Sequence, residues 1–156
     1  MATPLHDTTT FANNGTTGTT SLTVSHTAGA HSDLVALVAI VISTSGGDTV
    51  IDVTIDGAPP TGLVSSVTEG ANEAAYLYYS VGIEPGAFDV VVTTDATTRI
   101  CVAVSTFYDV NQTSTYRNEG TAKTTGDTAL TSATVNSTNV ETAFFVLGKR
   151  NTTEDP

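Results

Sequence analysis

Short apolar or alternating runs recur along this chain at intervals of about ten residues, with glycine, proline, asparagine or aspartate between them. The longest run, residues 34–42, contains nine consecutive side chains without a polar atom. A run of this length is about half of what a bilayer-spanning helix needs. It therefore predicts a central strand of a sheet that is covered on both faces, and not a membrane segment.

Two shorter runs alternate apolar and polar side chains, which is the pattern of a strand with one face in a core. The first covers residues 19–26 and the second covers residues 49–56. Leu22, Val24 and His26 share one face of the first run, and Ile51, Val53 and Ile55 are expected to point inward in the second. The polar residues between them predict a solvated outer face.

The remaining runs predict further strands and the loops between them. Residues 73–81 form an aromatic strand that ends near a Pro-Gly turn at Pro85 and Gly86. Residues 88–94 and 99–108 are interpreted as the two strands of a hairpin, joined by Asp-Ala-Thr. Other predicted strands are residues 63–68 (a short edge strand), 132–138 and 142–149; predicted loops are residues 56–62 and 117–128.

Composition supports an all-β fold without substantial helix. Threonine makes up about a fifth of the chain, and β-branched residues favour pleated strands over helices. We expect a single antiparallel β-sandwich, of jelly-roll or immunoglobulin-like kind, with about 8–10 strands. Its expected organisation is an N-terminal arm or first edge strand at 1–18, the sandwich at 19–148 and a C-terminal tail at 149–156.

The net charge of -11 is unevenly distributed, because no lysine or arginine precedes Arg99. An acidic surface repels phosphate backbones and anionic lipid headgroups. We therefore expect neither nucleic acid nor a membrane surface as a partner. The first residues contain no basic and apolar leader, so export by an N-terminal signal is not expected either.

Three residues near the start of the long apolar run could bind a divalent metal: His26, His31 and Asp33. They also fall where a turn between strands is expected, and turns collect polar residues without any chemistry. We therefore predict no metal site and no cofactor there. A second acidic set, Asp48, Asp52 and Asp56, alternates along one strand, and we interpret it as part of the solvated face.

No arrangement of residues identifies an enzyme. The chain has no G-x-S-x-G sequence, its three histidines all lie within the first 31 residues, and no two acids stand out as a glycosidase pair. The one cysteine, Cys101, lies between Ile100 and Val102, so we expect a buried, unreactive thiol. We predict a protein without catalytic residues.

Tyrosines on the aromatic strand offer a possible carbohydrate platform, since aromatic faces stack on sugar rings. The candidates are Tyr76 and Tyr78. Alternating tyrosines on a strand more often pack one ring face into the core, and the chain has no tryptophan. Both interpretations are kept.

The order of these segments resembles a recurrent β-sandwich domain of phage and archaeal virus structural proteins and of bacterial surface proteins. The shared pattern covers about residues 8–110 and consists of a series of strands and turns. They are the strand Leu22–Thr27, a small-residue turn, the apolar strand, the turn Val53–Gly57, the aromatic strand and a hairpin Val90–Phe107. The resemblance implies a scaffolding or surface role and no active site. Such domains usually close with one or two strands beyond the segment that resembles ETAFFVLG, so a truncated chain or pairing with a neighbouring subunit is expected.

The resulting hypothesis is a virion structural protein, most simply a capsid decoration or other surface module of a tailed virus. Its expected partners are the major capsid protein or a neighbouring surface protein, and further copies of itself in a homo-oligomer. The alternative is an extracellular carbohydrate-binding or adhesion module of a larger secreted protein. The two differ in location, at the virion surface or outside a cell.

Overall fold

The computed structural model of the chain describes residues 4–43, 48–69 and 73–113, which form seven strands and contain no helix. The strands are β1 Leu5–Asn13, β2 Thr19–Ala28, β3 Leu34–Ser43, β4 Val50–Ile55, β5 Gly62–Glu69, β6 Glu73–Ile83 and β7 Gly86–Tyr108. No helix that could span a membrane occurs in this part of the chain. The predicted strands at 132–138 and 142–149, the loop at 117–128 and the tail at 149–156 lie outside the described residues. The all-β prediction is confirmed.

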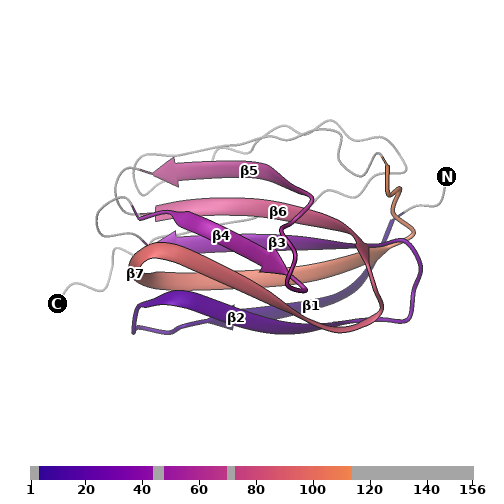
Figure 1. Ribbon diagram of the computed structural model, residues 1–156, viewed down its shortest axis with the longest axis horizontal. Helices are drawn as coiled ribbons and strands as arrows, with labels where there is room; N and C mark the ends of the chain where they lie inside the picture. The colour runs from indigo at the N-terminus through magenta and orange to yellow at the C-terminus, as the bar shows by residue number, and fades with distance from the viewer. Residues whose placement is uncertain (1–3, 44–47, 70–72, 114–156) are drawn as a thin grey trace, which may run out of the picture.

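All strand pairs are antiparallel, and one path through the sheet runs β1-β7-β3-β6-β5. β2 and β4 pair with the first half of β7, on either side of it, whereas β1 and β3 pair with its second half. β7 curls back at one end of the molecule, so that its two halves belong to two layers (Figure 1). The sheet formed by the described residues is not closed.

The predicted hairpin at 88–94 and 99–108 is wrong, because these residues form one continuous strand of 23 residues whose halves do not pair with each other. The bend is held by polar contacts to both layers. Asp95 accepts hydrogen bonds from the backbone N–H (2.7 Å) and the hydroxyl (3.1 Å) of Thr49, just before β4. The Thr98 hydroxyl donates to the carbonyl of Ser43 at the end of β3. Residues 93–98 contain no glycine or proline to interrupt the strand.

One apolar core lies between the layers. The predicted central strand is confirmed: β3 lies between β6 and β7, and its core-facing side chains at Ile40 and Ile42 have no exposed surface. Val24 and His26 of β2 share one face, as the alternation predicted, and both are buried. The core cluster consists of Val24, Ala28, Leu34, Ala36, Val38, Ile40, Ile42, Val53, Ile55, Ala74, Phe88, Val90, Val92, Ile100, Val102 and Val104.

Two sequence-based expectations about burial are wrong. Ile51 is 61% exposed, because a register irregularity between Val50 and Asp52 takes it out of the alternation with Val53. Cys101 is exposed as well. Its neighbours Ile100 and Val102 are the residues of β7 that face the core, so Cys101 points to the opposite side of the sheet.

A matched pair of substitutions tests this assignment of inside and outside. Ile40→Ala should lower the free energy of unfolding by about 2–5 kcal/mol, since it opens a cavity at a fully buried site. Ile51→Ala makes the same chemical change at an exposed site and should cost less than about 0.5 kcal/mol. Urea denaturation of both variants gives the two values. Equal losses would contradict the fold described.

Candidate functional site

An inward-facing polar cluster lies where β1, β2 and the end of β7 meet. It begins with a β-bulge in β1: His6 pairs with Phe107 and Thr9 with Ser105, so three steps along β1 match two along β7. A bulge re-aims the side chains next to it. Here it turns Asp7 toward Thr106, a residue of β7 with no exposed surface.

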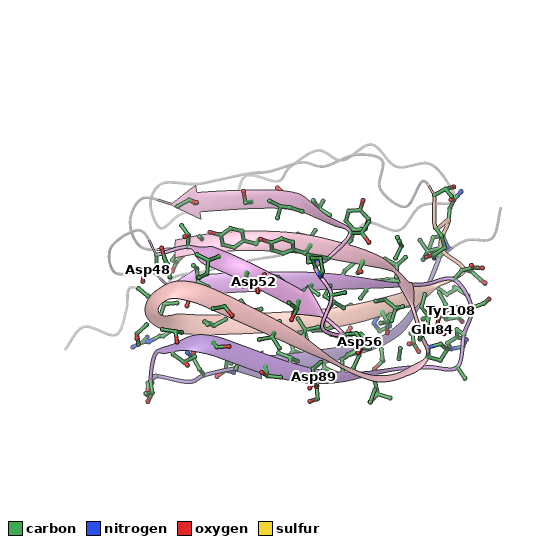
Figure 2. All side chains as sticks on the ribbon, in the orientation of Figure 1. Asp48, Asp52, Asp56, Glu84, Asp89 and Tyr108 are labelled. Carbon is green, nitrogen blue, oxygen red and sulfur yellow. The ribbon has the colours of Figure 1, made fainter. Side chains whose placement is uncertain are left out.

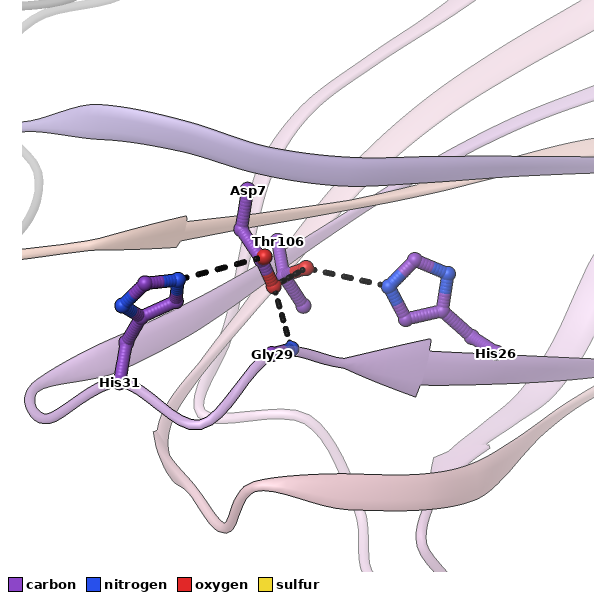
Figure 3. Close-up of polar contacts among 5 residues, drawn as sticks. All are labelled: Asp7, His26, Gly29, His31 and Thr106. Carbon is purple, nitrogen blue, oxygen red and sulfur yellow. Dashed lines mark hydrogen bonds and ion pairs between the residues drawn. The ribbon is translucent and has the colours of Figure 1, made fainter.

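Four side chains of this cluster form a continuous chain of hydrogen bonds: Thr10, His26, Thr106 and Asp7. Nδ1 of His26 lies 2.9 Å from the Thr10 hydroxyl, and Nε2 lies 3.1 Å from the Thr106 hydroxyl. That hydroxyl donates to Oδ2 of Asp7 (2.8 Å), which also accepts the backbone N–H of Gly29 at 2.8 Å (Figure 3). The chain therefore joins β1 to β2, to β7 and to the start of the β2–β3 connection.

The surroundings of Asp7 and His26 favour a carboxylate and a neutral ring. Burial opposes the ionisation of Asp7, but the hydrogen bonds from Gly29 and Thr106 and the charges of His31 and His26 outweigh it, so the pKa of Asp7 lies below its ordinary value of 3.8. Burial lowers the pKa of His26 below 6.5, although the Asp7 charge opposes this shift. Near neutral pH the chain of hydrogen bonds therefore ends at the ionised carboxylate of Asp7 and includes the uncharged ring of His26.

This charge state gives the hydrogen bonds a direction. A carboxylate can only accept, so the single hydroxyl hydrogen of Thr106 is committed to Asp7. Thr106 Oγ1 must then accept from His26, which places the ring hydrogen on Nε2. Nδ1 is left as an acceptor, and the Thr10 hydroxyl donates to it. Both ring nitrogens are occupied in this way and His26 is 1% exposed, so the arrangement orders protons inside the fold but offers no reactive atom to a substrate.

The candidate metal residues are separated into different environments. His31 does not join His26; its ring stacks on Tyr108 at a centroid distance of 3.9 Å, and its Nε2 lies 3.7 Å from Oδ1 of Asp7. Asp33 adopts a left-handed backbone conformation in the β2–β3 connection (φ 53°). In the part of the chain that the structure describes, no three His, Cys, Asp or Glu side chains form a group that could hold a metal ion.

Sequence reasoning identified His26 but missed its partners. Asp7, Thr10 and Thr106 lie up to about a hundred positions apart, a separation of 99 between Asp7 and Thr106, and threonines are too common here to stand out. Alternation along residues 99–108 would place Thr106 on the same face as Val102 and Val104, and all three are buried. This shared face was the signal in the sequence from which the burial of Thr106 could have been predicted. The bulge that turns Asp7 inward has no signature in the sequence.

The two outer faces of the sheet differ sharply. On the layer of β1, β7, β3, β6 and β5, the register lines up Phe11, Ala103, Ala39, Leu77 and Ser65 in one row, and Asn13, Cys101, Val41, Ala75 and Val67 in the next. Neither row contains a charged side chain. Phe11 is 77% exposed, and Ala39 is buried without belonging to the core cluster. We call these two rows the apolar outer face.

The opposite face, on β2, β4 and the first half of β7, is polar and acidic. Asp52, Asp56 and Asp89 lie exposed on this layer (Figure 2), and the Ser25 hydroxyl donates to Oδ1 of Asp89 at 2.6 Å. The predicted solvated face is thus confirmed at Asp52 and Asp56, whereas Asp48 is half-buried. A protein with two such different faces presents one to solvent more readily than the other.

Tyr76 and Tyr78 lie at the margin of the core. Both are half-buried and pack against the core cluster, and their rings lie 6.4 Å apart with 18° between the planes. Burial, then the neighbouring Tyr76 and Asp52, raises the pKa of Tyr78 above 10.0. The half-buried rings leave less of their faces open for stacking on a sugar.

Comparison of the chain with protein-family models, with curated proteins and with solved structures finds no match. The candidate site therefore has to be interpreted from its own geometry.

The direction of the hydrogen-bond chain predicts the tautomer of His26. Long-range ¹⁵N–¹H NMR at pH 7.5 should show the ring hydrogen on Nε2 and none on Nδ1, because Thr106 donates to the Asp7 carboxylate. A ring hydrogen on Nδ1 would contradict the assigned direction.

A second prediction concerns the hydroxyl in the middle of the chain. Thr106→Val keeps the size of the side chain but leaves Nε2–H of His26 without its acceptor, and should cost about 1–3 kcal/mol of unfolding free energy. Thr106→Ser keeps the hydroxyl and loses one buried methyl group, so it should cost about 0.8 kcal/mol. Urea denaturation at pH 7.5 distinguishes them. A Val variant as stable as the Ser variant would show that the hydroxyl contributes nothing.

Proposed function

We propose that this chain is a non-enzymatic structural protein of a tailed-virus particle, a capsid decoration or other surface module that acts through symmetric protein–protein contacts. Its partners would be the major capsid protein or a neighbouring surface protein, together with further copies of the chain. The finer fold that goes with this proposal is a β-sandwich, in which the two halves of β7 belong to facing sheets.

The contrast between the two outer faces is the observation that supports this proposal most directly. The apolar outer face includes the exposed Phe11 and Cys101, and its two central rows contain no charge. Large exposed apolar patches on soluble proteins mark sites of contact with other molecules. The acidic face with Asp52, Asp56 and Asp89 suits contact with solvent. A module that attaches by one face and displays the other would have this asymmetry.

The resemblance of residues 8–110 to viral and surface β-sandwich domains points in the same direction. It carries scaffolding and display roles without an active site. The interior polar cluster agrees with such a role, because its ring nitrogens are occupied by Thr10 and Thr106. The proposal therefore assigns function to surfaces and not to a pocket.

Cysteine labelling on purified particles tests the proposal, because Cys101 is the one cysteine of the chain and lies on the apolar outer face. A maleimide should modify Cys101 readily in the isolated protein and at least tenfold more slowly in the particle. The matched control is a Cys101→Ser, Thr23→Cys double variant, which moves the thiol to an exposed position on the acidic face. It should react equally in both states.

Mass spectrometry of the same particles provides the second requirement. The chain should be present in the number of copies that a symmetric surface lattice demands. Absence from purified particles, or protection of the Thr23→Cys position in place of Cys101, would contradict the proposal.

A further inference from the structure

One end of the outer face on the layer of β1, β7, β3, β6 and β5 is buried, although no described strand lies over it. Val35, Ser105 and Phe107 point to this side, because the residues next to them along β3 and β7 face the core. They are only 2%, 2% and 7% exposed. In the described part of the chain, the other layer consists of β2, β4 and the first half of β7 and lies across the core from them. We call these three residues the shielded end of the outer face.

Exposure changes steeply along β7 on this same face. Cys101 is exposed and Ala103 is half-buried, whereas Ser105 and Phe107 are buried. All four residues lie between the same two neighbouring strands, β1 and β3. Side chains on a strand stand roughly perpendicular to the sheet, so flanking strands alone shield such positions from the sides and leave them open above. The shielded end therefore has a cover that Cys101 lacks.

Two aromatic rings on this face account for only part of that cover. The ring of His6 lies edge-on against Phe107, with 5.4 Å between the ring centroids, and shields it from the side of β1. The ring of Tyr79 lies over Gly62 of β5, where an added Cβ atom would be 2.7 Å from the ring atom Cε1. Tyr79 thus leans toward β5 and away from β7. Neither ring lies over β3, the strand between them.

We propose that residues 143–147 of the same chain, Ala-Phe-Phe-Val-Leu, dock over the shielded end of the outer face. These residues lie outside the described part of the chain and fall within the strand predicted at 142–149. They contain the longest uninterrupted series of large apolar side chains in residues 114–156, and each phenylalanine can bury a large apolar area. This docking is independent of the proposed function, because it leaves Phe11 and Cys101 open.

The described chain ends next to the shielded end, so this segment can reach it. Beyond β7, the Val110 N–H donates to the carbonyl of Asp33, just before β3, at 3.3 Å. Oε1 of Gln112 accepts the N–H of Gly82, near the end of β6, at 2.8 Å (Figure 1). Residues 114–142 provide 29 further residues. Even a random coil of this length spans about 30 Å, which is roughly the length of β3.

Charge favours this segment over a second copy of the chain as the cover. Residues 1–113 contain eleven acids and one base, Arg99, whereas residues 114–156 contain five acids and four bases. Two of these bases, Lys149 and Arg150, closely follow the apolar run. Two copies that met through residues 1–113 would bring together surfaces of the same charge, which repel each other. The segment instead brings an apolar run and two cations to an acidic body.

Thiol labelling of the full chain tests the docking. The probe is a Cys101→Ser, Ser105→Cys variant, whose single thiol lies at the shielded end and should react slowly with a maleimide. Phe144→Asp together with Phe145→Asp should make this thiol react at least tenfold faster, because two carboxylates oppose burial against an apolar face. Unchanged labelling in a chain that keeps its far-ultraviolet circular dichroism spectrum would overturn the proposal.

The matched control adds the same two charges outside the apolar run. Thr152→Asp together with Thr153→Asp should leave the labelling of Ser105→Cys slow, because these residues lie beyond the docked segment. Equal acceleration by both pairs of aspartates would trace the effect to net charge and not to docking, and would overturn the proposal as well.

Crosslinking with an unaltered apolar run decides the matter if the aspartate variant fails to fold. In a Cys101→Ser chain, Ala103→Cys at the border of the shielded end and Thr142→Cys just before the run should be joined by a short bismaleimide into a closed monomer. Thr23→Cys on the acidic face, paired with Thr142→Cys, should not be joined. A crosslinked dimer would show that a second copy supplies the segment, and this result or the absence of a closed monomer would overturn the proposal.

Discussion

The alternation of side chains along β7 is the constraint on which the rest of the fold depends. This strand pairs with β1 and β3 through its second half and with β2 and β4 through its first. Even-numbered residues point into the core on both sides of the bend, from Phe88 to Val104. A shift of one residue would turn every one of them to the outside. One continuous strand therefore sets the register of both layers at once.

Much of this arrangement can be predicted from the sequence, because alternation is a local signal. Val24 and His26 share a face, the apolar run 34–42 forms a central strand, and the acids at Asp52 and Asp56 lie outside, all as expected. What failed depends on departures from strict alternation or on partners distant in sequence. A register irregularity in β4 exposes Ile51. The residues Asp-Ala-Thr, which resembled a turn, instead form the bend of the continuous strand β7.

The polar cluster shows why a candidate site is harder to predict than a fold. His26 was expected at the end of a strand with no binding role, and nothing in the sequence indicated that its two ring nitrogens meet hydroxyls from two other strands. Those hydroxyls belong to threonines, the most abundant residue type in this chain. The carboxylate that orients them reaches the interior through the bulge between His6 and Thr9. Each of these facts requires the long-range pairing of β1 with β7, which no local pattern records.

Two kinds of interaction hold different parts of the molecule, and they respond to different conditions. The apolar core joins β2, β3, β4, β6 and β7 and contains no carboxylate. β1 relies on directed hydrogen bonds whose order comes from the charge of Asp7 and the neutrality of His26. Hydrophobic burial changes little across the range in which histidine titrates, whereas the polar chain is reordered by a single proton. The core cluster that gives the chain its shape therefore contains no titratable side chain, whereas the polar chain contains the buried His26 between β1 and β7.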